Sequence, residues 1–182
     1  GNTPWCDALA LSFLAQTGLR FGEPAALKWK FIDFDKKRVY VRSAVRKAEG
    51  GTATVGITKT VRSGEISKSR RSVFLTPHLI AELKEWKLRS PASGDEDRVF
   101  LTHSLEMHKD SNHLRRNVLH PACDKAGIDR LRVHDLRHFF ASLCVDLYGD
   151  NWNRIADLLG HESTETTRKH YAEWIDNTDR DD

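Results

Sequence analysis

The sequence predicts an α+β fold that is mostly helical and contains a small three-stranded antiparallel sheet. Apolar residues recur at helical spacing on both sides of a central stretch, and within that stretch the pattern becomes alternating and rich in β-branched residues. The length of 182 residues, with 39% hydrophobic and 30% charged residues, suits one globular domain. No repeat, low-complexity tract or long linker divides the sequence, so we predict one domain over residues 1–182.

The composition excludes several classes of protein. No apolar run approaches the roughly 18 residues that a membrane-spanning helix needs. The first residues, Gly1 to Pro4, have neither the basic start nor the apolar core of a signal peptide. Cys6, Cys123 and Cys144 are widely separated, which argues against a disulfide framework and a cysteine-rich zinc site. We therefore predict a cytoplasmic protein with no membrane contact.

The first helix is expected over residues 5–16, where Trp5, Leu9 and Phe13 form an apolar stripe that stops at Thr17-Gly18. A short second helix is expected around residues 22–29, with the Glu23 carboxylate in its first turn, near the positive end of the helix dipole.

Three extended segments follow, at residues 38–42, 52–61 and 72–75. Gly50-Gly51 and Ser63-Gly64 supply the turns between them. These segments predict the three-stranded antiparallel sheet.

Further helices are expected in the second half. Thr76 is a predicted N-cap, Pro77 suits the first helical position, and this helix ends before Pro91. The remaining helices are expected at about residues 110–126, 133–147, 152–159 and 164–176.

The net charge of +3 hides an uneven distribution. Residues 36–71 hold eleven basic residues and two acidic ones, a charge of +9, which leaves −6 for the rest of the chain. A basic segment that coincides with the predicted sheet indicates a surface that meets a polyanion such as DNA.

The segment from Val133 to Ala141 is the most informative one. On a helix, His134 and Arg137 share a face, while Leu136, Phe140, Leu143 and Leu147 form the expected buried stripe. By themselves His134 and Arg137 are better explained as ordinary surface residues, so this spacing alone does not indicate a site. His134 and His138 have the i, i+4 spacing of a zinc site, but no glutamate follows the first histidine and no third ligand is evident, so we predict no metal.

Two other segments contain polar residues at predicted helix ends. Gly160 suits a left-handed helix cap, with His161 in the turn that follows and Ser163 or Thr164 capping the next helix. Arg20 lies between the first two helices, where it either forms a surface ion pair with Glu23 or is oriented by Glu23 to hold a phosphate.

These motifs, taken in order, resemble the tyrosine recombinase (phage integrase) family. They are Arg20 within Thr-Gly-Leu-Arg-Phe-Gly-Glu, His134-Asp135-Leu136-Arg137, Leu159-Gly160-His161, and Tyr171 shortly after Thr166-Thr167. The resemblance covers the catalytic domain of that family from the first helix to Tyr171. It implies the integrase catalytic-domain fold, with the family's N-terminal core-binding and arm-binding domains absent from this chain.

The resemblance also implies the site residues. Arg20 and Arg137 would neutralise the scissile phosphate, His134 would act as the base, His161 would donate a hydrogen bond, and Tyr171 would attack, with Glu23 in support. Lys59, in Thr58-Lys59-Thr60, would be the general acid on the hairpin. Lys68 is the reserve candidate, and Lys47 is a third possibility.

The implied function is site-specific cleavage and rejoining of duplex DNA through a 3′-phosphotyrosine, which integrates or excises a phage or mobile element without ATP, metal or cofactor. The expected partner is double-stranded DNA, bound as a homotetramer by a protein that is monomeric without DNA. The residues expected to contact DNA are Arg42, Arg46, Lys47, Arg62, Lys68, Arg70 and Arg71. The alternatives are a DNA-binding module that does not cleave and a metal-dependent hydrolase built on the histidines.

Overall fold

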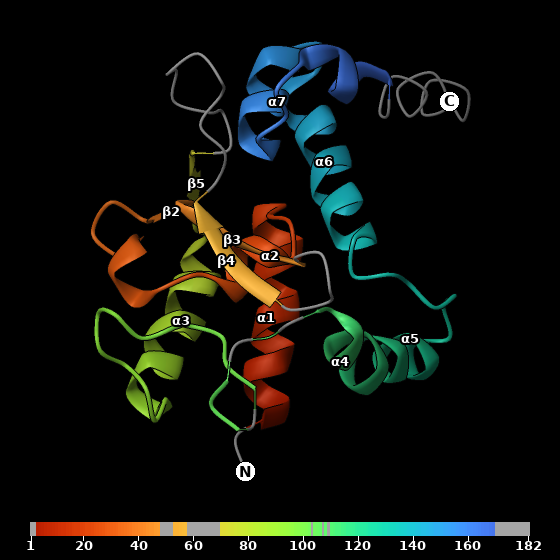
Figure 1. Ribbon diagram of the computed structural model, residues 1–182. Helices are drawn as coiled ribbons and strands as arrows, with labels where there is room; N and C mark the ends of the chain where they lie inside the picture. Colours follow the sequence, from red (N-terminus) through yellow and green to blue (C-terminus); the bar gives the residue numbers. More distant parts are fainter. Residues whose placement is uncertain are drawn as a thin grey trace.

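Helix α1 (Thr3–Thr17) lies at the centre of the fold in the computed structural model (Figure 1). It contacts both α3 (Pro77–Arg89) and α6 (Asp135–Tyr148), and α6 packs in turn against α7 (Trp152–Leu159). Residues 164–169 form a further helical segment. The residues that the structure describes are 3–47, 53–57, 70–102, 104–106, 108 and 110–169. The predicted turns at Gly50-Gly51 and Ser63-Gly64 lie outside them.

The prediction for α3 is confirmed at both ends. The Thr76 side chain accepts a hydrogen bond from the Leu79 backbone N–H at 3.2 Å, and Pro77 occupies the first helical position. The helix ends at Arg89, before Pro91.

The helix predicted for residues 110–126 contains a wider turn in its middle. It consists of α4 (Asn112–Leu114), a π-helical segment η2 (Arg115–Leu119) and α5 (His120–Ala126). Pro121 has no N–H to donate within this stretch, and a proline inside a helix is a common cause of such a local change of winding. Gly127, at φ +68°, ends the helix in the left-handed conformation.

The antiparallel sheet has three strands, but their identity differs from the prediction. The order is β1 (Ile32–Asp33), β2 (Arg38–Tyr40) and β5 (Ser72–Phe74), with Val39 opposite Val73. The predicted middle strand belongs instead to a separate two-stranded sheet of β3 (Ser43–Lys47) and β4 (Ala53–Ile57). The two-residue strand β1 is too short to produce a detectable alternating pattern.

The hairpin of β3 and β4 lies against the short helix α2 (Gly22–Ala25), which is followed by the 3₁₀ turn η1 (Trp29–Phe31). A Cβ atom on Gly22 would come within 2.4 Å of the Val45 carbonyl oxygen, so glycine permits this close approach. The helix predicted over residues 22–29 is shorter than expected, since α2 ends at Ala25 and Trp29 belongs to η1.

Two hydrophobic clusters support these elements. The larger one joins α1, the three-stranded sheet and α3, with Phe13, Val39, Val73 and Leu83 at its centre. The smaller one joins α6 and α7.

The predicted buried stripe of α6 is wrong at Leu143 and Leu147, whereas Leu136 and Phe140 are partly buried and pack against the two hydrophobic clusters. Leu143 and Leu147 are 41% and 76% exposed, whereas the buried side chains are those of Arg137, Ala141, Ser142, Cys144 and Val145. The small residues on this face accommodate the larger Ile155 and Leu159 of α7, a complementarity that helix spacing alone does not reveal. The face of α6 that is buried therefore includes Arg137, which was expected on a different face from the buried one.

A polar contact centred on the buried Asp7 ties α1 to α4 and to the segment that precedes α4. The Asp7 carboxylate lies 2.8 Å from Nε2 of His113 and 3.7 Å from Nε2 of His108, and the side chains of Asp7 and His108 are both buried. Asp7 is distant in the sequence from both histidines, so sequence spacing does not reveal this contact. Burial lowers the pKa of His108 below its ordinary value of 6.5, and the charge of Asp7 opposes this shift.

The lowered pKa predicts a pH-dependent stability. Below about pH 6.5 the unfolded chain gains a proton at His108 that the folded chain resists, so the free energy of unfolding falls as the pH drops. Thermal unfolding monitored by circular dichroism is expected to show a lower midpoint at about pH 5.5 than at about pH 7.5. His108→Asn should reduce that difference, and substitution of the exposed His78 by Asn should not. An equal pH dependence in His108→Asn and the unmodified chain would contradict this assignment.

Candidate active site

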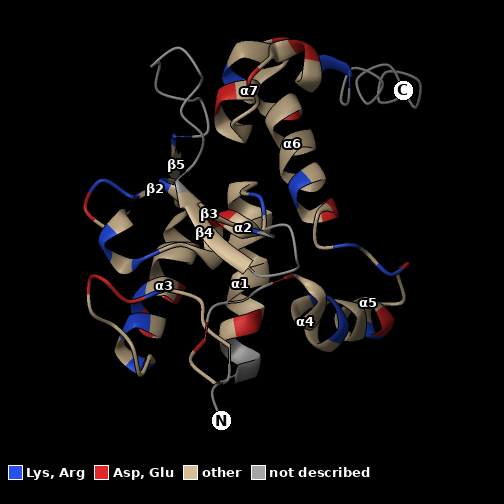
Figure 2. Cartoon of the chain, viewed as in Figure 1, with Lys and Arg blue, Asp and Glu red and all other residues tan. Residues whose placement is uncertain are grey.

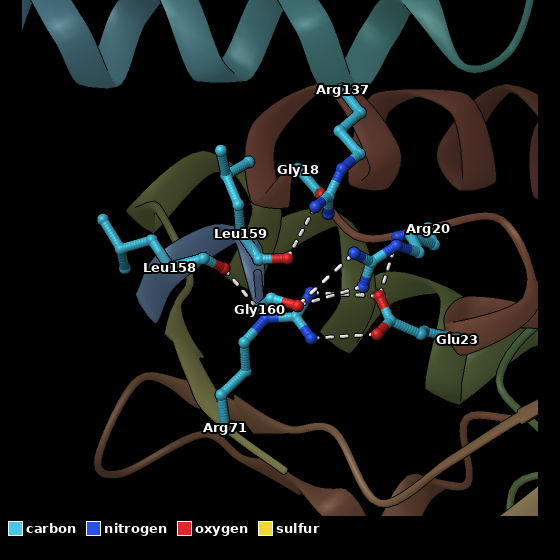
Figure 3. A network of polar contacts seen from close by, with 8 residues as sticks. All are labelled: Gly18, Arg20, Glu23, Arg71, Arg137, Leu158, Leu159 and Gly160. Atoms are coloured by element: carbon cyan, nitrogen blue, oxygen red, sulfur yellow. Dashed lines mark hydrogen bonds and ion pairs between the residues drawn. The ribbon is translucent and has the colours of Figure 1, made fainter. Parts of the chain in front are cut away.

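Arg137 is buried where the ends of α1 and α7 meet the first turn of α6. Its Nη1 donates to the Gly18 carbonyl at 2.5 Å and its Nη2 to the Leu159 carbonyl at 2.7 Å (Figure 3). Gly18, at φ +62°, lies so close to Phe140 of α6 that an added Cβ would come within 2.2 Å of the ring. The guanidinium group is thus held by backbone carbonyls from two different helix ends.

Arg20 is held by the next carbonyl along the same turn. Both of its terminal nitrogens lie 3.3 Å from the Gly160 carbonyl oxygen, the neighbour of the Leu159 carbonyl that accepts from Arg137 (Figure 3). The residue keeps an exposed outer surface, but burial of its inner part lowers the pKa of the guanidinium group. The turn after α7 therefore brings together two arginines that are far apart in the sequence.

Glu23 orients the Arg20 loop through the backbone. Its Oε2 accepts the Arg20 backbone N–H at 2.7 Å, and its two carboxylate oxygens accept from Nη1 and Nη2 of Arg71 at 2.9 and 3.0 Å. Its ion pair is therefore formed with Arg71 and is buried, unlike the surface pair with Arg20 that the sequence suggested as one alternative.

Arg71 is the site residue whose location differs most from the prediction. It was expected on the DNA-binding surface, but it is only 9% exposed and its Nε donates to the Leu158 carbonyl at 2.8 Å. The expected surface position of Arg71 is wrong, because its guanidinium group is directed into the protein toward Glu23 and the end of α7.

The turn that carries His161 has the predicted geometry. Gly160 adopts φ +66° and ends α7, and the Ser163 side chain accepts the Glu165 N–H at 3.0 Å at the start of the next helical segment. Nδ1 of His161 lies 2.7 Å from the hydroxyl of Thr167, which is fully buried. This contact fixes the imidazole ring beside the turn that binds both arginines.

His134 lies at the N-cap position of α6, one helical turn before Arg137, and the residue keeps an exposed surface although part of its ring is buried. Its ring packs edge-to-face on His138, with centroids 4.9 Å apart. Partial burial lowers the pKa of His134, and the neighbouring charges of His138, Arg137 and Arg20 act in the same direction. The arrangement favours a neutral imidazole at neutral pH, as a general base requires.

A titration tests this assignment directly. In the protein without DNA, the NMR resonance of the His134 ring is expected to titrate with a midpoint below its ordinary value of 6.5. His134→Gln identifies the resonance by its loss. A midpoint above 6.5 would show that the neighbouring positive charges do not act on this ring.

The remaining predicted residues are less fully described. Lys59, Arg62, Lys68 and Tyr171 lie outside the described residues. Arg42 and Arg46 are exposed at β3, Lys47 ends that strand, and Arg70 is exposed just before β5. Figure 2 shows further basic residues in the connection between β1 and β2.

The predictions from sequence missed three groups that shape the site: the Gly18 carbonyl, the Leu159 carbonyl and the Thr167 hydroxyl. Every residue has a backbone carbonyl, so no sequence pattern could have singled out the first two. Within the described part of the chain, no group of three or more His, Cys, Asp or Glu side chains is arranged to hold a metal ion.

The sequence matches the profile of the phage integrase family over residues 2–177. The chain belongs to the phage integrase family. Among curated members, it is 26% identical over 171 residues to the ICEBs1 integrase of Bacillus subtilis, covering 91% of this chain and 44% of that protein. It is 29% identical over 164 residues to an integrase of Mycobacterium phage D29, covering 89% of this chain and 42% of the relative.

Solved structures of integrases and recombinases agree with this family fold. The integrase of the transposon Tn1549, in complex with transposon right end DNA, gives a TM-score of 0.72 at 19% identity and covers 91% of this chain and 53% of that one. XerA recombinase gives a TM-score of 0.66 at 26% identity, with coverage of 91% and 51%. The predicted integrase catalytic-domain fold is confirmed.

The chain spans less than half the length of these two curated relatives. None of its helices, within the residues described, has the length and apolar character needed to cross a membrane.

Proposed function

We propose that this chain is the catalytic part of a site-specific recombinase that cleaves and rejoins duplex DNA through a 3′-phosphotyrosine. The observation that carries the proposal is the joint anchoring of Arg20 and Arg137 by consecutive carbonyls of the turn that leads into His161. This arrangement gathers two permanent cations and an imidazole, which suits one phosphate group.

The chemistry follows from the charge that develops during phosphoryl transfer. When an oxygen attacks a phosphodiester, negative charge grows on the non-bridging oxygens, and guanidinium groups already fixed in place stabilise it without reorganising. The carbonyl contacts hold one side of each guanidinium group in this way. A neutral His134 next to Arg137 can accept the proton of the attacking hydroxyl.

Tyr171 is the proposed nucleophile. A phenol with an ordinary pKa near ~10 requires a base and nearby positive charge to attack at neutral pH. Its attack would form a bond between phosphorus and the phenolic oxygen, and the 5′-oxygen of the DNA would leave. Thr167, hydrogen-bonded to His161, lies four residues before Tyr171 in the sequence, which supports a position close to the phosphate.

Lys59 is proposed to protonate the leaving 5′-oxygen, with Lys68 as the alternative and Lys47 as a third candidate. β4 ends at Ile57, two residues before Lys59, and β5 begins at Ser72, four residues after Lys68. Both lysines thus belong to the connection that leaves the hairpin and enters the three-stranded sheet.

The proposed partner is a specific duplex DNA site of a phage or mobile element, bound by a homotetramer whose subunits are monomeric without DNA. Arg42, Arg46 and Arg70 are exposed in or near the strands that flank this connection, which supports contacts with phosphates. Arg62, Lys68 and Lys47 complete the proposed DNA contacts. The proposed location is the bacterial cytoplasm, where the DNA lies.

Covalent capture distinguishes cleavage from mere binding. The protein is incubated in EDTA with nicked duplexes of random sequence, in which the short strand beyond the nick dissociates after cleavage and prevents rejoining. After denaturation in detergent, DNA is expected to remain attached to the protein, and the attached sequences should converge on one site. DNA that is bound before denaturation but fully released afterwards would favour the non-cleaving DNA-binding module. DNA that is cut only without EDTA, and without any covalent adduct, would favour the metal-dependent hydrolase, which transfers the phosphate to water.

A further inference from the structure

The hydrogen bonds of the Arg71 side chain to Glu23 and Leu158 both lead to the proposed active site. The two terminal nitrogens of Arg71 bind the two oxygens of Glu23 at 2.9 and 3.0 Å, and its Nε binds the Leu158 carbonyl at 2.8 Å (Figure 3). Only 9% of the residue is exposed. A planar guanidinium group can make such a fork and a third contact at once, whereas an ammonium group cannot match this geometry.

Each partner of Arg71 either binds an arginine of the site itself or is next in sequence to a residue that does. Glu23 accepts the backbone N–H of Arg20 at 2.7 Å, so the carboxylate that Arg71 holds also sets the loop of Arg20. Leu158 immediately precedes Leu159 and Gly160, whose carbonyls hold Arg137 and Arg20. Fixing Glu23 and Leu158 therefore fixes the anchors of both arginines.

The surroundings are built to accept the Arg71 side chain. A Cβ atom on Gly160 would lie 2.5 Å from Nη1 of Arg71 and 2.8 Å from its Cζ, so the glycine that ends α7 also leaves space for this guanidinium group. The Arg71 carbonyl accepts the Val41 N–H at 2.8 Å, which fixes the backbone at the start of β5. The residue thus connects the sheet to the turn after α7.

We propose that Arg71 is a positioning residue for DNA cleavage. It holds Glu23 and the end of α7 in the arrangement that aligns Arg20 and Arg137, and it does so from the position just before β5. The inference rests on the proposed function and assigns Arg71 no contact with DNA. It adds a residue that acts through Glu23 and the Leu158 carbonyl and does not touch the phosphate.

The test compares Arg71→Lys with the unmodified chain in single-turnover cleavage at saturating DNA. Because small misplacements of catalytic groups cost up to about 100-fold in rate, we expect the cleavage rate of Arg71→Lys to fall on the order of 10-fold to 100-fold. The dissociation constant for DNA and its dependence on salt should change less than about 2-fold, since no phosphate contact is removed. Glu23→Gln should cause a similar loss of rate, and the double variant should lose less than the two single losses combined.

Arg70→Ala is the matched comparison. Arg70 is next to Arg71 in the sequence, but it is exposed and is proposed to contact DNA. The Arg70→Ala variant should show the opposite pattern, with weaker binding and a smaller salt dependence. In Arg71→Ala, added methylguanidinium should restore cleavage more than methylammonium at the same concentration. Circular dichroism identifies any variant that does not fold, and the lysine variant keeps the test informative if the alanine variant fails.

The possible outcomes are distinct. If the unmodified chain cleaves DNA and Arg71→Lys cleaves at the same rate, the positioning role is overturned and the proposed function stands. Weakened binding with a reduced salt dependence in Arg71→Lys would show a direct DNA contact and also overturn the role. If the unmodified chain forms no covalent product, it is the proposed function that fails.

Discussion

Tyr171→Phe is expected to abolish covalent attachment to DNA while changing the dissociation constant for the same duplex by less than about 2-fold. The substitution removes only the hydroxyl oxygen that would bond to phosphorus, so the ring can still contribute to packing. Denaturing electrophoresis after incubation with a nicked substrate measures the adduct, and a filter-binding titration measures the affinity.

The chain contains three tyrosines, which provides a matched control. Tyr148 is 42% exposed at the end of α6, and its ring faces the guanidinium group of Arg154 at 6.0 Å. Tyr148→Phe should therefore form the adduct at the rate of the unmodified chain. An adduct that persists in Tyr171→Phe, or one that disappears in Tyr148→Phe, would remove Tyr171 from the mechanism.

Arg137→Lys is expected to lower the single-turnover cleavage rate about 100-fold to 1000-fold, in the range seen when one preorganised donor to an oxyanion is lost. The guanidinium group donates to the Gly18 and Leu159 carbonyls. A lysine keeps the charge but has no planar fork that could bind two carbonyls and a phosphate oxygen together. The effect should appear in the rate at saturating DNA.

Arg132→Lys is the control for this effect. Arg132 is exposed and pairs with Asp135 at 2.8 Å, at the start of the same helix but outside the site. Surface pairs of this kind contribute little, so its cleavage rate should stay within about 2-fold of the unmodified chain. Equal rates for Arg137→Lys and Arg132→Lys would contradict the assignment of Arg137 to the phosphate site.

The sequence predicted the parts of the fold that depend on local signals. Thr76, Pro77 and Gly160 act at helix ends, where one residue type has a strong preference and a clear physical reason, and all three have the expected roles. The strand pairing of residues 53–57 was predicted less well, because neighbouring extended segments offer more than one partner and the sequence does not choose between them.

The predictions that failed concern residues whose role depends on tertiary packing. Leu143 and Leu147 have helical spacing with Phe140, yet the small Ala141 and Cys144 face α7 instead. Arg71 lies in the most basic part of the sequence, but its side chain points inward because the buried carboxylate of Glu23 compensates its charge. Charge along the sequence therefore does not distinguish the exposed Arg42, Arg46 and Arg70 from Arg71, whose carboxylate partner is buried.

The central claim is that this chain cleaves DNA by bonding Tyr171 to a 3′-phosphate, and mapping the covalent bond tests it most directly. The adduct with nicked DNA is trimmed by nuclease and digested with trypsin, which cuts after Lys169 and after Arg180. Mass spectrometry is expected to find the peptide of residues 170–180 carrying a nucleotide 3′-phosphate on Tyr171. The claim would be contradicted by a nucleotide on any other peptide, or by an unmodified 170–180 peptide in a sample that contains the adduct.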